Sequence, residues 1–186
     1  MSRIKVIPYE ESTGRLKEIY DSLLSSRGKI ADVHTIQSLR PESIVKHMDL
    51  YMEIMFTKSE LSRAEREMMA VVVSVANQCE YCQLHHAAAL NHYWKDEAKV
   101  NKLRADFEEV ELSAREKILC GFANLLTVAP EVYEDDKYLK PLVDIGLSDS
   151  AILDASLVVS YFNFVNRMVL SLGLKIDDDE VKGYAY

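Results

Sequence analysis

The sequence predicts an all-α protein, because helical periodicity dominates it and the residues that end helices are scarce. Only 6 Gly and 4 Pro occur among 186 residues, which leaves strand-and-turn architectures few residues for their turns. Long segments instead repeat apolar residues at helical spacing. Three of these segments begin with the same Leu-Ser pair, at Leu61, Leu112 and Leu147, which marks three helix starts.

The serines of these pairs predict how the helices begin. Ser62 and Glu65 have the spacing of the S-x-x-E capping box, in which each side chain bonds a free amide of the first turn. Ser113 and Glu116 have the same spacing. Ser148 is followed by an aspartate, whose charge suits the positive end of the helix dipole. The two S-x-x-E helices hint at an internal duplication.

The expected elements form one unbroken series, without a linker or a low-complexity run, so we expect a single domain. In chain order they are a helix at about Glu10–Leu24, an irregular link at Arg27–Arg40, helices at about Pro41–Phe56, Ser62–Ala76, Cys79–His92, Asp96–Phe107 and Ser113–Val128, a short helix at Glu131–Leu139, and a last long helix at Ser148–Leu172, followed by Gly173 and a segment rich in Asp.

The last helix is apolar on most of its faces, which is typical of a helix at the centre of a core or between subunits. One polar stripe interrupts it, formed by Asn163, Asn166 and Arg167 at spacings of three and four. We expect this stripe to be a solvated edge, with a polar subunit contact or the wall of a site as the alternative.

Charge and composition exclude several kinds of partner. The net charge of −8, from 22 basic and 30 acidic residues, argues against nucleic acid and membrane, since both need a basic surface. The first residues lack the apolar stretch of a signal peptide, and no segment reaches the roughly 18 uninterrupted apolar residues of a membrane span. We therefore expect a cytoplasmic protein, in which a C-x-x-C pair is catalytic or metal-binding rather than a structural disulfide.

Two thiols and a histidine form the most informative motif. Cys79 and Cys82 are three residues apart, so at the start of a helix both lie in the first turn and on nearly one face. Free amides and the helix dipole favour thiolate there, and such pairs titrate as low as roughly 3.5–7.5. His86 follows Cys82 by four residues and can take the thiol proton, with His85 as the second candidate.

The preceding helix supplies a carboxylate. Glu67 lies twelve residues before Cys79 and adjoins the apolar run 68–73, so it is either at the edge of its helix or held inward for a reason. Its neighbour Glu65 is already accounted for as a capping partner. Glu67, the two cysteines and the histidine together predict a redox-active thiol site.

A zinc site is the main alternative, with His85, His86 or His92 completing the ligands. A structural zinc usually has a second pair of ligands at some distance, and the only other cysteine, Cys120, has no such companion. We expect Cys120 to be a small core residue, His34 to be a surface residue of the irregular link, and no metal or cofactor to be bound. A thioredoxin-type fold needs a βαβ pattern, which the helical periodicity contradicts.

The pattern E-x11-C-x2-C-x3-H resembles the alkylhydroperoxidase D (AhpD) and carboxymuconolactone decarboxylase superfamily. The wider sequence is similar to a branch described as uncharacterised peroxidase-related proteins, through segments 38–41, 51–52, 61–67, 77–82 and 161–167. This resemblance implies an AhpD-like helical fold over residues 1–186, with a redox core at about 41–128 and a C-terminal core helix at about 148–172.

The resemblance also implies roles for the site residues. Cys82 takes the place of the peroxidatic cysteine, Cys79 that of the resolving cysteine, and Glu67 and His86 those of the proton relay in a thiol-dependent, antioxidant hydroperoxide reductase. In AhpD itself a second histidine precedes the second cysteine, whereas Tyr81 stands there in this chain. Either the tyrosine hydroxyl acts in the relay, or the relay is shorter and the peroxidase weaker.

The implied partners are a hydroperoxide substrate, a dithiol or protein reductant such as a lipoyl group or a peroxiredoxin, and further copies of the chain. No metal, flavin or haem is implied. Two other functions stay open. Lactone decarboxylation is the other activity in the superfamily name, although that branch is not defined by a C-x-x-C. A redox-sensing or disulfide-relay protein would cycle the same thiols without turning over peroxide.

Overall fold

The computed structural model describes residues 2–175, and within them the chain forms helices and no strands, which confirms the all-α prediction. The Asp-rich segment expected near the end lies outside the described residues. The α-helices are α1 (Gly14–Arg27), α2 (Asp32–Thr35), α3 (Pro41–Phe56), α4 (Arg63–Ala76), α5 (Glu80–Trp94), α6 (Glu97–Ala105), α7 (Ala114–Val128), α8 (Lys140–Asp144) and α9 (Asp149–Leu172).

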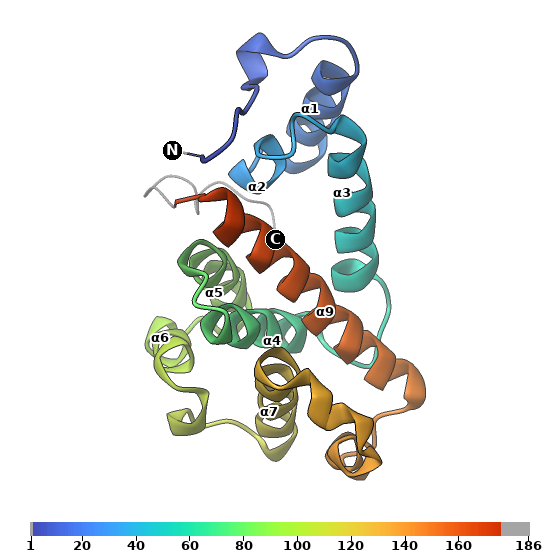
Figure 1. Ribbon diagram of the computed structural model, residues 1–186. Helices are drawn as coiled ribbons and strands as arrows, with labels where there is room; N and C mark the ends of the chain where they lie inside the picture. Colours follow the sequence, from blue (N-terminus) through green and yellow to red (C-terminus); the bar gives the residue numbers. More distant parts are fainter. Residues whose placement is uncertain (1, 176–186) are drawn as a thin grey trace.

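Helix α9 crosses the molecule diagonally, with α1 to α3 on one side of it and α4 to α7 on the other (Figure 1). Helix α4 packs against α5, α7 and α9, and every residue of α4 from Arg66 to Ser74 is buried. The main apolar core therefore gathers around α4. A second, smaller core joins α1 to α3 through Leu16, Ile19, Tyr20, Leu23 and Ile44.

Side-chain caps begin three of the helices where the sequence predicts them. Ser62 and Ser113 each accept a hydrogen bond from the amide three residues on. Glu65 and Glu116 accept bonds from the backbone amides of these serines, which completes both capping boxes. Ser148 caps α9 through the amide three residues on.

Some of the expected boundaries are wrong. The first helix begins at Gly14 rather than near Glu10, because residues 9–11 form a separate 3₁₀ turn. The link expected to be irregular contains α2, whose four residues are too few to show helical periodicity. The short helix expected at Glu131–Leu139 is instead a pair of 3₁₀ turns followed by α8.

The polar stripe on α9 is not a solvated edge, because one of its residues bonds to α4 and another to the C-cap residue of α4. Asn166 is fully buried and donates to the hydroxyl of Ser74 at 3.4 Å. The carbonyl oxygen of the Asn163 side chain accepts from the side-chain amide of Asn77 at 3.0 Å. Only Arg167 of the three is exposed.

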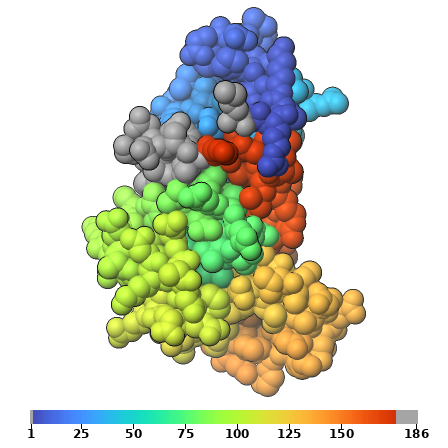
Figure 2. Space-filling model, turned by 60° about the vertical axis from the view of Figure 1, so that its left-hand side comes forward, coloured from blue at the N-terminus to red at the C-terminus, as the bar shows by residue number. Residues whose placement is uncertain are grey.

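The apolar character of α9 reflects its packing. Among the helices of residues 2–175, it is the one whose length and composition would suit a membrane span. In the fold its buried residues lie against α3, α4 and α7. The N-terminal segment covers its end (Figure 2), where the Arg3 amide donates to the Leu172 carbonyl at 2.8 Å and the Arg3 guanidinium bonds two further carbonyls. These contacts satisfy acceptors that a helix C-terminus leaves free.

Candidate active site

The two thiols lie at the corner between α4 and α5. Gln78 has a φ of 57°, a left-handed conformation that costs a residue other than Gly about 1–3 kcal/mol and allows this tight reversal. The amide of Cys79 donates to the carbonyl of Ser74 at 2.9 Å, at the end of α4. The carbonyl of Cys79 accepts from the Gln83 amide at 2.9 Å, so Cys79 is the N-cap of α5 and Cys82 falls in its first turn. The structure pairs the two cysteines as a disulfide with Cα atoms 5.4 Å apart.

Glu67 is the buried carboxylate of the site. Its Oε2 lies 2.8 Å from Nδ1 of His86, and its Oε1 accepts two bonds from the Arg63 guanidinium at 2.6 and 3.0 Å. Burial alone would raise the pKa of Glu67, but the hydrogen bonds and charges of His86 and Arg63 outweigh it and lower the pKa. Glu67 is therefore ionised around neutral pH.

The carboxylate of Glu67 determines the tautomer of His86. A carboxylate oxygen can only accept, so Nδ1 of His86 must carry a proton. Nε2 of the neutral ring then holds the lone pair, which is the form that can take a proton from a thiol. The Phe162 ring packs at a right angle against the imidazole, with 4.3 Å between centroids, and holds its orientation.

Arg63 completes this network and was not predicted from the sequence. Besides Glu67, its guanidinium donates to the Tyr51 hydroxyl and to the Met55 carbonyl, each at 3.1 Å. It also lies over the Phe56 ring at 3.8 Å from the centroid. The only sequence signal was its spacing of four residues from Glu67, which ordinary surface ion pairs share.

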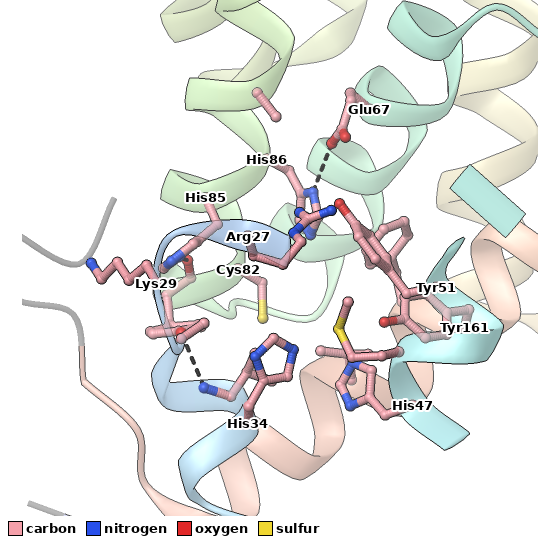
Figure 3. Close-up of a pocket in the computed structure, with 17 residues that line it drawn as sticks. Arg27, Lys29, His34, His47, Tyr51, Glu67, Cys82, His85, His86 and Tyr161 are labelled. Atoms are coloured by element: carbon pink, nitrogen blue, oxygen red, sulfur yellow. Dashed lines mark hydrogen bonds and ion pairs between the residues drawn. The ribbon is translucent and has the colours of Figure 1, made fainter. Parts of the chain in front are cut away.

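A cavity of about 110 Å³ is lined by Cys82 and by residues of α1 to α5 and α9. Most of the wall is aromatic or aliphatic, and two cations, Arg27 and Lys29, belong to it. Figure 3 shows the sulfur of Cys82 between two groups of labelled residues: His86 and Glu67 on one side, and His34 and His47 on the other, with Tyr51 and Tyr161 alongside.

The two accessory residues, Tyr81 and His85, also line the cavity. The Tyr81 hydroxyl accepts from the Val33 amide at 3.3 Å, which joins α5 to α2. The Tyr81 ring stacks on His85, with 4.3 Å between centroids, and Nδ1 of His85 lies 2.9 Å from the Tyr81 carbonyl oxygen. The histidine that Glu67 orients is His86 rather than His85.

The far wall contains two histidines that the sequence did not place there. His34 was expected at the surface, but α2 turns it inward and leaves it only 9% exposed. Its ring meets that of His47 edge-on, with 5.6 Å between centroids. Burial lowers the pKa of His47 to about 4, so this imidazole is neutral.

The described residues do not support the zinc alternative, and Cys120 lies outside this site. Within residues 2–175, no three His, Cys, Asp or Glu side chains are grouped so that they could hold a metal ion. Of the zinc ligands considered, His86 bonds Glu67 and the two cysteines bond each other. Cys120 is buried in α7 as expected, and burial raises the pKa of its thiol to about 12.

The chain is similar to a known protein family over part of its length. The model of the carboxymuconolactone decarboxylase family matches residues 44–106, a segment that contains α4, α5 and the four site residues Glu67, Cys79, Cys82 and His86. No curated protein matches the chain in sequence.

Solved structures share the fold over nearly the whole chain. One is the alkylhydroperoxidase AhpD core of an uncharacterized peroxidase-related protein from Ralstonia eutropha JMP134, at 22% identity and a TM-score of 0.86, covering 97% of this chain and 94% of that one. Another is an uncharacterized peroxidase-related protein from Silicibacter sp. TM1040, at 25% identity and a TM-score of 0.82, covering 96% and 91%. A variant of the debrominase Bmp8 in complex with 2,3,4-tribromopyrrole matches at 16% identity and a TM-score of 0.79, covering 97% and 96%.

These similarities show that the chain has the AhpD-like all-α fold. Over residues 44–106 the chain is similar to the carboxymuconolactone decarboxylase family, and over nearly its whole length it shares the fold of AhpD-like peroxidase-related proteins.

Proposed function

We propose that this protein is a thiol-dependent hydroperoxide reductase. One observation carries the proposal: Cys82 lines the same cavity as the Glu67–His86 pair, with Cys79 close enough to form a disulfide with it. Because Glu67 bonds Nδ1 of His86, Nε2 is the nitrogen of the neutral ring that can accept a proton. The start of α5 favours a thiolate at Cys82.

The reaction uses the two thiols in turn. His86 takes the proton of Cys82, and Glu67 stabilises the imidazolium. The thiolate attacks the terminal oxygen of R–O–OH, so an S–O bond forms, the O–O bond breaks, and the alkoxide leaves as ROH with the proton from His86. The thiol of Cys79 then displaces water from the sulfenic acid, which leaves the Cys79–Cys82 disulfide.

An external dithiol closes the cycle by thiol–disulfide exchange. A lipoyl-type dithiol or a protein thiol would supply the two electrons, and a reducing cytoplasm would keep that donor reduced. None of these steps uses a metal, flavin or haem.

The test follows consumption of cumene hydroperoxide in the presence of dithiothreitol or dihydrolipoamide. Cys82→Ser should abolish turnover. Reduced Cys79→Ser, assayed after the dithiol has been removed, should consume one equivalent and stop at a sulfenic acid that dimedone traps. Cys120→Ser, which removes the buried thiol of α7, is the matched control and should keep the wild-type rate. Peroxide consumption by Cys82→Ser at the wild-type rate would contradict the mechanism.

Reductive debromination is the second candidate. It is favoured by the similarity to the debrominase Bmp8 over nearly the whole chain and by the aromatic walls of the cavity, which suit a flat ring. The same two thiols could supply the electrons, replacing C–Br by C–H with release of HBr and formation of the disulfide. Bromide release from 2,3,4-tribromopyrrole, measured beside peroxide consumption, distinguishes the two functions.

We also propose that the protein forms homo-oligomers through α9. Leu153, Leu157 and Phe164 lie on one face of this helix and are 58%, 38% and 52% exposed. Apolar side chains aligned in this way are typical of an interface. Light scattering after size exclusion should give a multiple of the 21.2 kDa chain mass, and Phe164→Glu should reduce it. A monomer for the unsubstituted protein would contradict the proposal.

A further inference from the structure

The hydrogen bonds of Gln37 determine which nitrogen of His47 carries its proton. The side-chain nitrogen of Gln37 lies 2.8 Å from the Val33 carbonyl oxygen and 2.8 Å from Nδ1 of His47. A backbone carbonyl only accepts, so the atom facing it must be the NH₂ group of the amide. Its second hydrogen points to Nδ1 of His47, which must then hold a lone pair. The proton of His47 therefore sits on Nε2.

This N–H is a polar group that the protein itself leaves unused. His47 is 7% exposed and lines the cavity that contains Cys82. Within residues 2–175, no hydrogen bond is made by Nε2 of His47, and Nε2 is not among the side-chain atoms sealed from solvent. Because Nε2 is open to solvent and meets no acceptor in the part of the chain that the structure describes, this N–H can donate to a ligand that brings an acceptor into the cavity.

The surroundings of His47 specify the rest of that ligand. The Tyr161 ring meets the imidazole edge-on, with 5.6 Å between centroids, and Met48, Phe162 and Val165 add apolar wall. The cavity holds about 110 Å³ and is partly open to solvent, so it suits a compact ligand that it does not fully enclose. Hydrogen peroxide has no apolar body to bury against such a wall, whereas a compact organic hydroperoxide has both a body and oxygen acceptors.

We propose that His47 contacts the substrate, donating from Nε2 to an oxygen of a compact organic hydroperoxide whose apolar body lies against Tyr161 and its neighbours. This inference rests on the proposed reductase function and names its substrate class. As Cys82 attacks the terminal oxygen and the O–O bond breaks, charge develops on the alkoxide oxygen. The His47 N–H stabilises that charge by a hydrogen bond and keeps its own proton. The proton that the alkoxide takes up comes from His86.

Three substitutions separate this role from a structural one. His47→Phe keeps a ring and removes the donor, whereas His47→Gln places an amide N–H near the position of Nε2. His92→Phe removes an imidazole of α5 that does not line the cavity and is the matched control. The measurements are kcat/KM for cumene hydroperoxide and for hydrogen peroxide, with the rate at which iodoacetamide alkylates reduced Cys82 as a check on the thiol.

His47→Phe should lower kcat/KM for cumene hydroperoxide by about 10- to 100-fold, with alkylation of Cys82 unchanged. His47→Gln should stay within about threefold of wild type, because it keeps the hydrogen bond. His92→Phe should match wild type. An unchanged kcat/KM in His47→Phe would overturn the proposal, as would a wild type that prefers hydrogen peroxide.

If the protein turns over no hydroperoxide, only the proposed reductase function fails. A binding measurement then still tests the contact that His47 makes with a ligand. Calorimetry compares 2-phenyl-2-propanol, the product alcohol, with cumene, which lacks the hydroxyl. The reduced wild type should bind the alcohol about 10-fold more tightly than cumene, and His47→Phe should lose this preference. Equal binding by the wild type, or a preference retained by His47→Phe, would overturn the role of His47.

Discussion

Burial of a neutral imidazole makes the stability of this protein depend on pH. Burial lowers the pKa of His47 to about 4 from an ordinary value of 6.5. Between these values the unfolded chain binds more protons than the folded chain, so the folded state loses stability as the pH falls from 6.5 toward 4. At about 1.4 kcal/mol per pH unit, the full contribution is about 3 kcal/mol, of which about 2 kcal/mol is lost by pH 5.

The perturbation that isolates this contribution is His47→Phe. Urea denaturation of both proteins at pH 7.5 and pH 5.0, at one protein concentration and in the same reductant, gives four free energies of unfolding. Wild type should lose about 2 kcal/mol more than the variant between the two pH values, because every other titrating group is common to both proteins. Equal losses would refute the assignment of His47 as a buried neutral histidine.

Three further predictions concern stability and thiol reactivity. Arg63→Met should lower the free energy of unfolding by about 3 kcal/mol in urea denaturation, because it removes one partner of the buried Glu67 carboxylate; a loss under about 1 kcal/mol would contradict this. Ser62→Ala and Ser113→Ala should each cost about 1 kcal/mol by the same measurement, and an unchanged value would mean that the capping boxes add nothing. Iodoacetamide at pH 8 should leave Cys120 unlabelled in the native, reduced protein while it labels the redox pair, since burial raises the pKa of the Cys120 thiol to about 12; mass spectrometry showing equal labelling would contradict this.

Local chemistry made the corner between α4 and α5 predictable. The capping box at Ser62 marks the start of α4, and the C-x-x-C pair marks the start of α5. Once both helices are placed, the spacing of Glu67, Cys82 and His86 brings them into one region. The direct bond between Glu67 and His86 could not be predicted, because it depends on how α4 and α5 pack.

The other half of the cavity depends on contacts between segments far apart in the chain. His34 lies on a helix of four residues, too short to be recognised by periodicity, and His47 lies on a helix whose inward face only tertiary packing determines. Asn166 was misjudged for a related reason. From the sequence alone, an asparagine on an apolar helix is expected to face solvent. Here it is buried because Ser74 of α4 accepts its hydrogen bond, and this contact depends on how the two helices pack.

The left-handed residue between α4 and α5 makes the chain length at this corner part of the chemistry. Gln78 lies in the short link, residues 77–79, between the helix that bears Glu67 and the helix that bears Cys82. Each residue of an α-helix turns the chain by about 100°, so one residue inserted into α4 after Glu67 would swing the carboxylate away from the imidazole it orients. The number of residues between Glu67 and Cys82 thus sets the position of the carboxylate relative to the thiol. A change of one residue in that number would disable the site without altering any of its side chains.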